Sequence, residues 1–372
     1  MRHKMKNIIL FLFLITFLGI VVGANIYLSR RFAWYFSISN IKSVYIIFAS
    51  LTVFMFGGII AFTNSASISG NIFYLIAATL MGILLYLIIS ALFVDLLHFI
   101  IKVKPVFYGI AAISLTLIIS AYGIWNSYNL KTTQITIPLK GITRQVRAMH
   151  VSDVHLGHFR GKTFMQKIVD ATKKQDVDLV FITGDLFDGK YNLNMDVLSP
   201  LKELVIPIYF VEGNHDGYSG LKSIKTNLRQ TGVHVLENEV SPWGELQIIG
   251  LNHMPAGSDA VDMHSNNQGV TIKNVLSSLK IDTDIPSILL HHSPNGVKFA
   301  NEAGVDLFLA GHTHAGQLFP IDYISRLMFQ YYRGAYDYNG TRIFVSEGAG
   351  TVGPPMRVGT KSEIAVITLK PE

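Results

Sequence analysis

The chain has 372 residues, of which 50% are hydrophobic and only 15% are charged. This length allows two domains, and the composition is typical of a membrane protein. The sequence has no cysteine, which excludes disulfide bonds and thiolate-bound zinc. Any metal ion must therefore be bound by histidine, carboxylate or amide side chains.

The charge is distributed unevenly along the chain. Residues 1–152 contain 12 Lys and Arg but a single acid, Asp95, which gives a net charge of +11. Residues 153–372 contain 19 Lys and Arg and 24 acids, for −5, and the formal total is +6. The basic charge therefore flanks the apolar segments and is a poor argument for a nucleic-acid partner, which we do not expect.

Four apolar segments occupy the N-terminal region, at Ile8–Leu28, Ser43–Phe62, Ile72–Val94 and Val106–Trp125. Each has about 20 residues, enough to cross a bilayer core of roughly 30 Å. Aromatic residues gather at their ends, as is usual at a membrane interface. The first segment resembles a signal peptide, but three similar segments follow it, which favours a retained helix. We therefore predict a bundle of four transmembrane helices in residues 1–130 of a multi-pass cell-membrane protein.

Charges around these segments give opposing indications of topology. Basic residues in the first and third loops, including Arg30 and Lys102, favour cytoplasmic loops and an external C-terminal domain, whereas Arg2 near the N-terminus favours the reverse. We expect the C-terminal domain to face outside. Asp95 and His98 stand one turn apart near the end of the third segment, and we expect them at the interface rather than as a functional intramembrane pair.

After a polar connector at residues 131–145, short apolar runs alternate with amphipathic segments. The apolar runs predict strands at Val146–Val151, Leu179–Thr183, Ile208–Val211, Leu246–Leu251, Ser287–Leu290, Leu307–Ala310, Arg342–Ser346 and Glu363–Leu369. Helices are expected at Lys162–Lys174 and Ser219–Gln230. The alternation predicts a layered α/β or α+β domain over residues 146–372. The β-branched Thr132–Ile137 in the connector indicates an edge strand.

Side chains of metal-binding type follow five of these strands. They are Asp153 and His155, Asp185, Asn214 and His215, His291 and His292, and His312 and His314. Taken singly, each has an ordinary explanation as a turn, a helix cap or a hydrogen-bonded histidine. Sites in open α/β sheets lie at the carboxyl ends of strands, so the ordered set predicts one common site. His150, His158 and His253 are interpreted as ordinary histidines, although His253 could line a pocket.

The motifs Asp153-x-His155, Gly184-Asp185-x-x-Asp188, Gly213-Asn214-His215-Asp216 and Gly311-His312-x-His314 resemble those of the calcineurin-like metallophosphoesterase family. The resemblance covers about residues 146–370. The sequences Gly311–Gln317 and Val345–Thr351 are similar to a bacterial membrane-associated branch that includes phosphodiesterases similar to UDP-diacylglucosamine hydrolases. The resemblance implies a four-layer αββα fold, with two β-sheets between helices, and a two-metal site.

The resemblance also implies a ligand set. One metal would be bound by Asp153, His155, Asp185 and His314, and the other by Asp185, Asn214, His292 and His312, with Asp185 bridging. His292 is preferred to His291 because it stands two residues before Pro294, as in the family. Such donors suit Mn, Fe or Zn, and Mn is favoured.

Four further residues acquire roles from the resemblance and from general chemistry. His215 would donate a proton to the departing oxygen or stabilise its charge. Asp216 would orient that imidazole. Arg357 would contact phosphate or form a structural ion pair, and Glu347 would lie near the substrate.

The site predicts a membrane-anchored metal phosphohydrolase that cleaves phosphodiester or pyrophosphate bonds with a metal-activated water. The substrate would be a phosphorylated small molecule or lipid, lipid-linked or derived from the envelope. An alternative is a membrane scaffold or sensor whose domain binds phosphate ligands without turnover, and the full ligand set argues against it. The single internal acid and the absence of broken or repeated helices disfavour a transporter.

Overall fold

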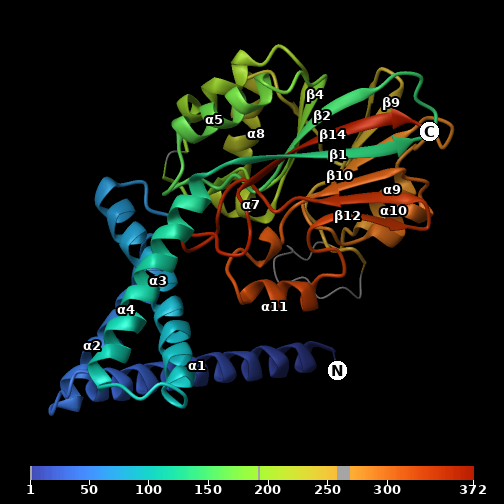
Figure 1. Ribbon diagram of the computed structural model, residues 1–372. Helices are drawn as coiled ribbons and strands as arrows, with labels where there is room; N and C mark the ends of the chain where they lie inside the picture. The colour runs from blue at the N-terminus through green and yellow to red at the C-terminus, as the bar shows by residue number, and fades with distance from the viewer. Residues whose placement is uncertain (1, 192, 258–268) are drawn as a thin grey trace. The chain divides into compact units, whose positions relative to one another are not determined.

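The computed structural model describes residues 2–191, 193–257 and 269–372 (Figure 1). The chain divides into two units, one of Met1–Ala61 with Ile76–Tyr122 and one of Phe62–Leu75 with Gly123–Glu372. The four long helices are α1 (Arg2–Tyr35), α2 (Ile41–Phe62), α3 (Ile68–His98) and α4 (Pro105–Tyr128). Each is long and apolar enough to cross a membrane, so the prediction of four such helices is confirmed.

The interior of the first unit combines apolar packing with one partly buried acid. Leu28, Phe48 and Leu84 belong to a cluster formed by α1, α2 and α3. The helix α3 continues past Asp95, whose carboxylate accepts hydrogen bonds from Tyr27 Oη at 2.6 Å and Arg31 Nε at 2.5 Å. Asp95 therefore binds to α1 rather than to His98, as expected for an acid among apolar helices that is paired to offset its desolvation.

Two six-stranded sheets form the centre of the second unit. The first sheet has the order β1 (Lys131–Leu139), β14 (Glu363–Pro371), β2 (Val146–Val151), β4 (Leu179–Thr183), β6 (Ile208–Val211) and β7 (His234–Val235). The second has the order β12 (Gly334–Tyr338), β13 (Thr341–Val345), β11 (Leu307–Ala310), β10 (Ser287–Leu290), β9 (Leu246–Gly250) and β8 (Glu239–Trp243). A short ladder joins β3 (Leu156–Gly157) to β5 (Phe187–Asp188). Every predicted strand is present, with small shifts at the ends.

Besides its strands, the second unit contains short helices. They are α5 (Lys162–Lys173), α6 (Met195–Leu198), η1 (Ser199–Glu203), α7 (Asn214–Ser219), α8 (Leu221–Gln230), α9 (Ile272–Ser278), α10 (Val297–Glu302), η2 (His314–Gly316) and α11 (Ile321–Met328). Ile168 of α5 and Leu228 of α8 pack on the first sheet, and Leu276 of α9 and Ala300 of α10 pack on the second. A third apolar layer lies between the sheets. The predicted αββα architecture is therefore confirmed.

Parallel pairing sets the position of the functional residues. The strands β2, β4 and β6 are mutually parallel, as are β9, β10, β11 and β13. Their carboxyl ends therefore lie along one edge of each sheet, where α/β proteins place their sites. At the opposite side of β2, β14 pairs antiparallel with β2 and parallel with β1. The β-branched residues before Pro138 thus form the edge strand that their composition indicated.

Parts of the long helices belong to the second unit. In the segment Phe62–Leu75, Asn71 Oδ1 lies 2.8 Å from Nδ1 of His158, and the Thr63 carbonyl lies 2.9 Å from its Nε2. At the end of α4, Asn126 Nδ2 donates to the carbonyls of Arg357 and Thr360 at 3.0 and 2.8 Å. Both ends of the α3–α4 hairpin are thus part of the same unit, as expected if the helices cross in alternating directions.

Candidate metal centre

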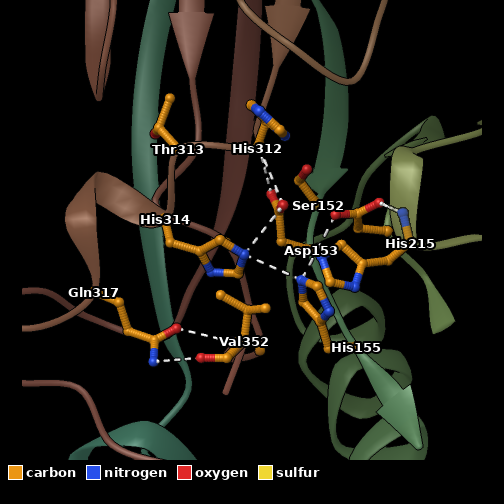
Figure 2. Close-up of polar contacts among 12 residues, drawn as sticks. Ser152, Asp153, His155, His215, His312, Thr313, His314, Gln317 and Val352 are labelled. Atoms are coloured by element: carbon orange, nitrogen blue, oxygen red, sulfur yellow. Dashed lines mark hydrogen bonds and ion pairs between the residues drawn. The ribbon is translucent and has the colours of Figure 1, made fainter. Parts of the chain in front are cut away.

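The predicted ligands gather into clusters at the carboxyl ends of the parallel strands. Asp153, His155 and His314 offer ligand atoms that all lie within 4.8 Å of one another, and so do Asp185, His292 and His312. Figure 2 shows His155 and His314 pointing toward one another beside Asp153. Segments that are far apart in the sequence therefore converge on one centre.

The backbone at these ligands is unusual. The φ angles are 54° at Asp153, 50° at His155, 48° at Asp185, 72° at His312 and 48° at His314. Non-glycine residues seldom adopt this left-handed conformation, and each instance costs of order 1–3 kcal/mol. Such conformations concentrate at functional sites. The strained backbone indicates that the direction of these ligand side chains matters more for this protein than the local stability of the chain.

The donor geometry fits cations. His155 Nε2 lies 3.0 Å from His314 Nε2, and His292 Nε2 lies 3.1 Å from His312 Nδ1. These separations are close to the roughly 3 Å that adjacent ligand nitrogens show around an ion bound at about 2.1 Å. Because His292 Nδ1 donates to the Thr183 carbonyl at 2.9 Å, its Nε2 presents a lone pair to the cluster.

The side chain of Asn214 gives a second test of whether these residues fit a bound cation. Its Oδ1 is buried, and it makes no hydrogen bond within the described part of the chain. A buried amide oxygen without a donor is costly, and a cation offsets that cost. The residue begins α7, beside the Asp185 carboxylate that accepts from the next backbone N–H, that of His215, at 2.8 Å. Asn214 therefore fits the role of a neutral oxygen ligand.

Asp185 lies between the two clusters. Its Oδ2 is 3.1 Å from His292 Nε2 and 3.8 Å from His155 Nε2, so one carboxylate oxygen faces ligand nitrogens of both. Burial raises the pKa of Asp185, but the imidazoles of His292 and His215 outweigh burial and hold it well below its usual value. The carboxylate is therefore ionised, as a bridging ligand must be.

The two adjacent histidines after β10 have different surroundings. His292 enters the cluster, whereas His291 Nδ1 lies 2.7 Å from the Ser293 carbonyl and the residue is absent from every ligand cluster found among the described residues. Burial lowers the pKa of His291 to about 4, so its ring is neutral at pH 7. The geometry thus favours His292, as the position of Pro294 suggested.

The carboxylate beside His215 is Asp188, and the assignment of this contact to Asp216 is wrong. His215 Nδ1 lies 2.9 Å from Asp188 Oδ1, while the two oxygens of Asp216 accept from the backbone N–H groups of Gly213 and Phe187, each at 2.9 Å. Burial lowers the pKa of His215, but Asp185 and Asp188 outweigh it and raise that pKa to about 9. Asp188 therefore orients the imidazole, and Asp216 holds the loop.

Substitutions at these two acids should separate orientation from folding. Asp188→Asn removes the charge beside His215, and we expect kcat to fall by about 10–100-fold with little change in thermal stability. Asp216→Asn weakens the double backbone cap, and we expect its main effect on Tm. Steady-state kinetics and thermal denaturation of both variants check this. A larger loss of Tm in Asp188→Asn than in Asp216→Asn would contradict it.

Gly311 permits the close approach of two ligand loops. A Cβ at this position would collide with Ser152 Oγ and Asp153 Oδ2, and the Asp153 carboxylate accepts from the next N–H, that of His312, at 3.0 Å. We expect Gly311→Ala to displace Asp153 and lower metal affinity by about 10–100-fold. Metal titration by isothermal calorimetry measures this. Gly217→Ala is the matched control, because a Cβ at Gly217 has no neighbour within 4 Å.

Two residues of the C-terminal tail have structural contacts. Arg357 is fully buried, and its guanidinium donates to the carbonyls of Glu347, Gly348 and Gly350 at 2.6–3.0 Å. Its Nη2 also lies 3.2 Å from Nδ1 of the ligand His314. Glu347 accepts from the Lys361 N–H at 3.0 Å. Arg357 therefore has a structural role: it supports His314 from the buried side and is not interpreted as a phosphate contact.

A cavity of about 500 Å³ opens beside the centre. Asn214, Tyr218, Asn238, Asn252 and His253 are among the residues that line it. The His253 ring lies 5.7 Å from that of His292 and 6.1 Å from that of His312. This histidine therefore lines the pocket, which was one of the two roles considered from the sequence.

His150, by contrast, is a core residue whose Nε2 lies 2.7 Å from Thr183 Oγ1.

Comparison with known proteins agrees with this geometry. The calcineurin-like phosphoesterase family profile matches residues 146–316. An uncharacterized metallophosphoesterase of Aquifex aeolicus is 32% identical over 263 residues, which cover 69% of this chain and 98% of that protein. The chain belongs to the calcineurin-like phosphoesterases. Members of this family use divalent metal ions, and the clusters described above are candidate sites for such ions in this metallophosphoesterase.

Other relatives extend the comparison. An uncharacterized metallophosphoesterase of Helicobacter pylori is 32% identical over 247 residues, covering 65% of this chain and 64% of that protein, so the match spans less than two thirds of the relative. A Danio rerio transmembrane protein with metallophosphoesterase domain is 29% identical over 280 residues, covering 70% of this chain and 62% of that protein. The four apolar helices and such relatives indicate a membrane-associated metallophosphoesterase.

Proposed function

We propose that this metallophosphoesterase is a membrane-anchored, two-metal phosphodiesterase. The observation that carries the proposal is the pair of ligand clusters with the Asp185 carboxylate between them, 3.1 Å from His292 Nε2 of one and 3.8 Å from His155 Nε2 of the other. One ion would be held by Asp153, His155, Asp185 and His314, and the other by Asp185, Asn214, His292 and His312. Bound divalent ions, with Mn²⁺ favoured, would supply an activated water and neutralise phosphate charge.

The chain's own groups support the remaining steps. His215 is oriented by Asp188 beside Asp185, and its side chain is 23% exposed, so it can reach a substrate. We assign it the transfer of a proton to the departing oxygen. Arg357 and the Thr183 carbonyl hold His314 and His292 in place from behind. The buried ligand positions keep these groups fixed before the substrate arrives.

The lining of the cavity favours a diester over a monoester. Among the described residues that line it, none is Lys or Arg, and Asn238 and Asn252 supply neutral amides. A monoester dianion gains more from cationic side chains than a singly charged diester does. Leu221 and Met254 give the same cavity an apolar part. The cavity therefore suits a phosphodiester that carries an apolar or uncharged group.

Hydrolysis by the full chain tests the proposal. The purified protein, depleted of metal with a chelator, would be given Mn²⁺ and either bis-(p-nitrophenyl) phosphate or p-nitrophenyl phosphate. We expect activity that requires Mn²⁺ and a higher kcat/KM for the diester. Asn214→Ala serves as the control for the site. A folded, metal-loaded chain that hydrolyses neither ester would overturn the proposal and favour the scaffold that binds phosphate without turnover.

We also propose that the catalytic unit lies outside the cytoplasm, because Arg30 and Lys42 flank the connection between α1 and α2, Lys102 lies between α3 and α4, and basic residues at such connections favour the cytoplasmic side. The cysteine-free sequence makes a simple test possible. Lys140→Cys, at a side chain that is 82% exposed, should react with a membrane-impermeant maleimide in intact cells. Lys102→Cys should react only after lysis. The reverse pattern would place the catalytic unit in the cytoplasm.

A further inference from the structure

The described part of residues 131–372 has one strong concentration of exposed apolar side chains. Of the ten large apolar residues of 131–372 that are exposed in the described structure, six lie within residues 319–328. They are Phe319, Ile321, Tyr323, Ile324, Leu327 and Met328. Exposed apolar patches of this kind mark sites of interaction with proteins or membranes.

The burial of α11 is reversed relative to that of an ordinary surface helix. Leu327 is 87% exposed, Met328 64% and Ile324 55%, whereas the polar Ser325 is only 7% exposed. Asp322 Oδ1 is also buried. A helix on the surface of a soluble domain turns its apolar stripe inward and its polar residues to water. The outward stripe of α11 therefore needs a partner of apolar chemistry.

We propose that α11 docks on the surface of the bilayer to which the four apolar helices anchor this chain. The helices confine the catalytic unit near a membrane, so a bilayer is always within reach. Tyr323 and Phe319 are residues of the aromatic type found at membrane interfaces, and the exposed Arg326 can meet anionic headgroups. A short helix with these features lies in the interface plane, with its apolar face below the headgroups.

The docking helix is joined closely to the metal centre. The helix η2 begins at the ligand His314 and is the main contact of α11. A Cβ at Gly316 would collide with Cα of Asp322, so the glycine lets α11 lie against the ligand loop. Leu318 forms a parallel β-bridge with Val358, the residue that follows Arg357 in the sequence. Docking of α11 would therefore bring the ligand loop that carries His314 close to headgroup level, where phosphodiesters of membrane lipids lie.

Depth measurement on the full chain tests the docking without any assumption about catalysis. Leu327→Cys would carry the only cysteine, and a nitroxide there would be examined in nanodiscs of phosphatidylethanolamine and phosphatidylglycerol. We expect oxygen to relax this label more than a water-soluble nickel chelate does, at a depth of about 5–10 Å. The same label at the exposed Lys280→Cys should show the opposite preference.

Other occupants of this face give different results. A label protected from both reagents, equally in nanodiscs and in detergent, would show that the chain's own helices cover α11. Spin–spin broadening that disappears on dilution with unlabelled protein would show a second copy. A label that prefers the nickel chelate would show an unoccupied face. Each of these results would overturn membrane docking.

A kinetic experiment tests whether docking of α11 promotes hydrolysis of a lipid substrate. This experiment rests on the proposed function. Ile324→Glu with Leu327→Glu places charge on exposed positions, so folding should be preserved. We expect unchanged hydrolysis of bis-(p-nitrophenyl) phosphate and at least about a tenfold loss with a phosphodiester lipid in vesicles. Equal loss on both substrates would overturn the link. A wild-type chain inactive on both would refute the proposed function while leaving the depth result intact.

Discussion

Asp185→Asn is expected to leave the chain without bound metal and to lower kcat for phosphoester hydrolysis by at least about 10³-fold, or ~4 kcal/mol. The reason is its shared position, with one oxygen 3.1 Å from His292 Nε2 and 3.8 Å from His155 Nε2. An amide at this place offers a neutral oxygen and a donor that repels cations. Elemental analysis of the Mn²⁺-loaded chain after gel filtration measures the metal content.

Variants at single clusters provide the matched controls. His314→Ala removes a ligand from one cluster and Asn214→Ala from the other, so each chain should retain one Mn²⁺ where the wild type retains two. Thermal denaturation would confirm that all variants are folded. An Asp185→Asn chain that keeps one ion would refute the bridging role. An Asn214→Ala chain that keeps two would remove Asn214 from the ligand set.

The strands and the ligand convergence could be predicted because both depend on local pattern. Buried parallel strands appear as continuous apolar runs, and β2, β4, β6, β10 and β11 begin and end where those runs do. Side chains that follow such runs must lie at one edge of a sheet. The sequence therefore indicated which residues come together. It could not indicate the left-handed backbone that directs Asp153 and His312 inward.

The orientation of His215 depends on contacts that sequence adjacency does not reveal. Asp216 is the next residue along α7, but neighbouring side chains on a helix point in different directions, and Asp216 turns back to the Gly213 N–H. Asp188 reaches the imidazole from β5, 27 residues earlier. Its place in the Gly184-Asp185-x-x-Asp188 motif was the available signal for that contact.

The helix α11 escaped sequence prediction for a different reason. Its apolar residues follow a helical period, but the run is short and begins just after Pro320. Whether an amphipathic face turns inward or outward depends on tertiary contacts. Here Gly316 and the ligand loop occupy the polar side of the helix. The pattern alone would have assigned Leu327 to the core, whereas the structure exposes it.

His215→Ala is expected to lower kcat by about 10²–10⁴-fold for a phosphodiester with a poor alkoxide leaving group, and far less for one that releases p-nitrophenolate. A basic alkoxide needs a proton as the P–O bond breaks, whereas p-nitrophenolate is stable without one. The imidazole is placed for this transfer by Asp188 at 2.9 Å. Rates for a series of aryl and alkyl esters measure the dependence on leaving-group basicity.

The slope of that dependence distinguishes a proton donor from a phosphate-binding group. Loss of a donor should make the rate of His215→Ala fall more steeply with leaving-group basicity than the wild-type rate does, with both metal ions retained. Asp188→Asn should give an intermediate slope, because the ring remains but its orientation is weakened. Parallel lines for wild type and His215→Ala would mean that His215 stabilises phosphate charge throughout the reaction. In that case the proton would come from another group or from water in the cavity beside Asn214.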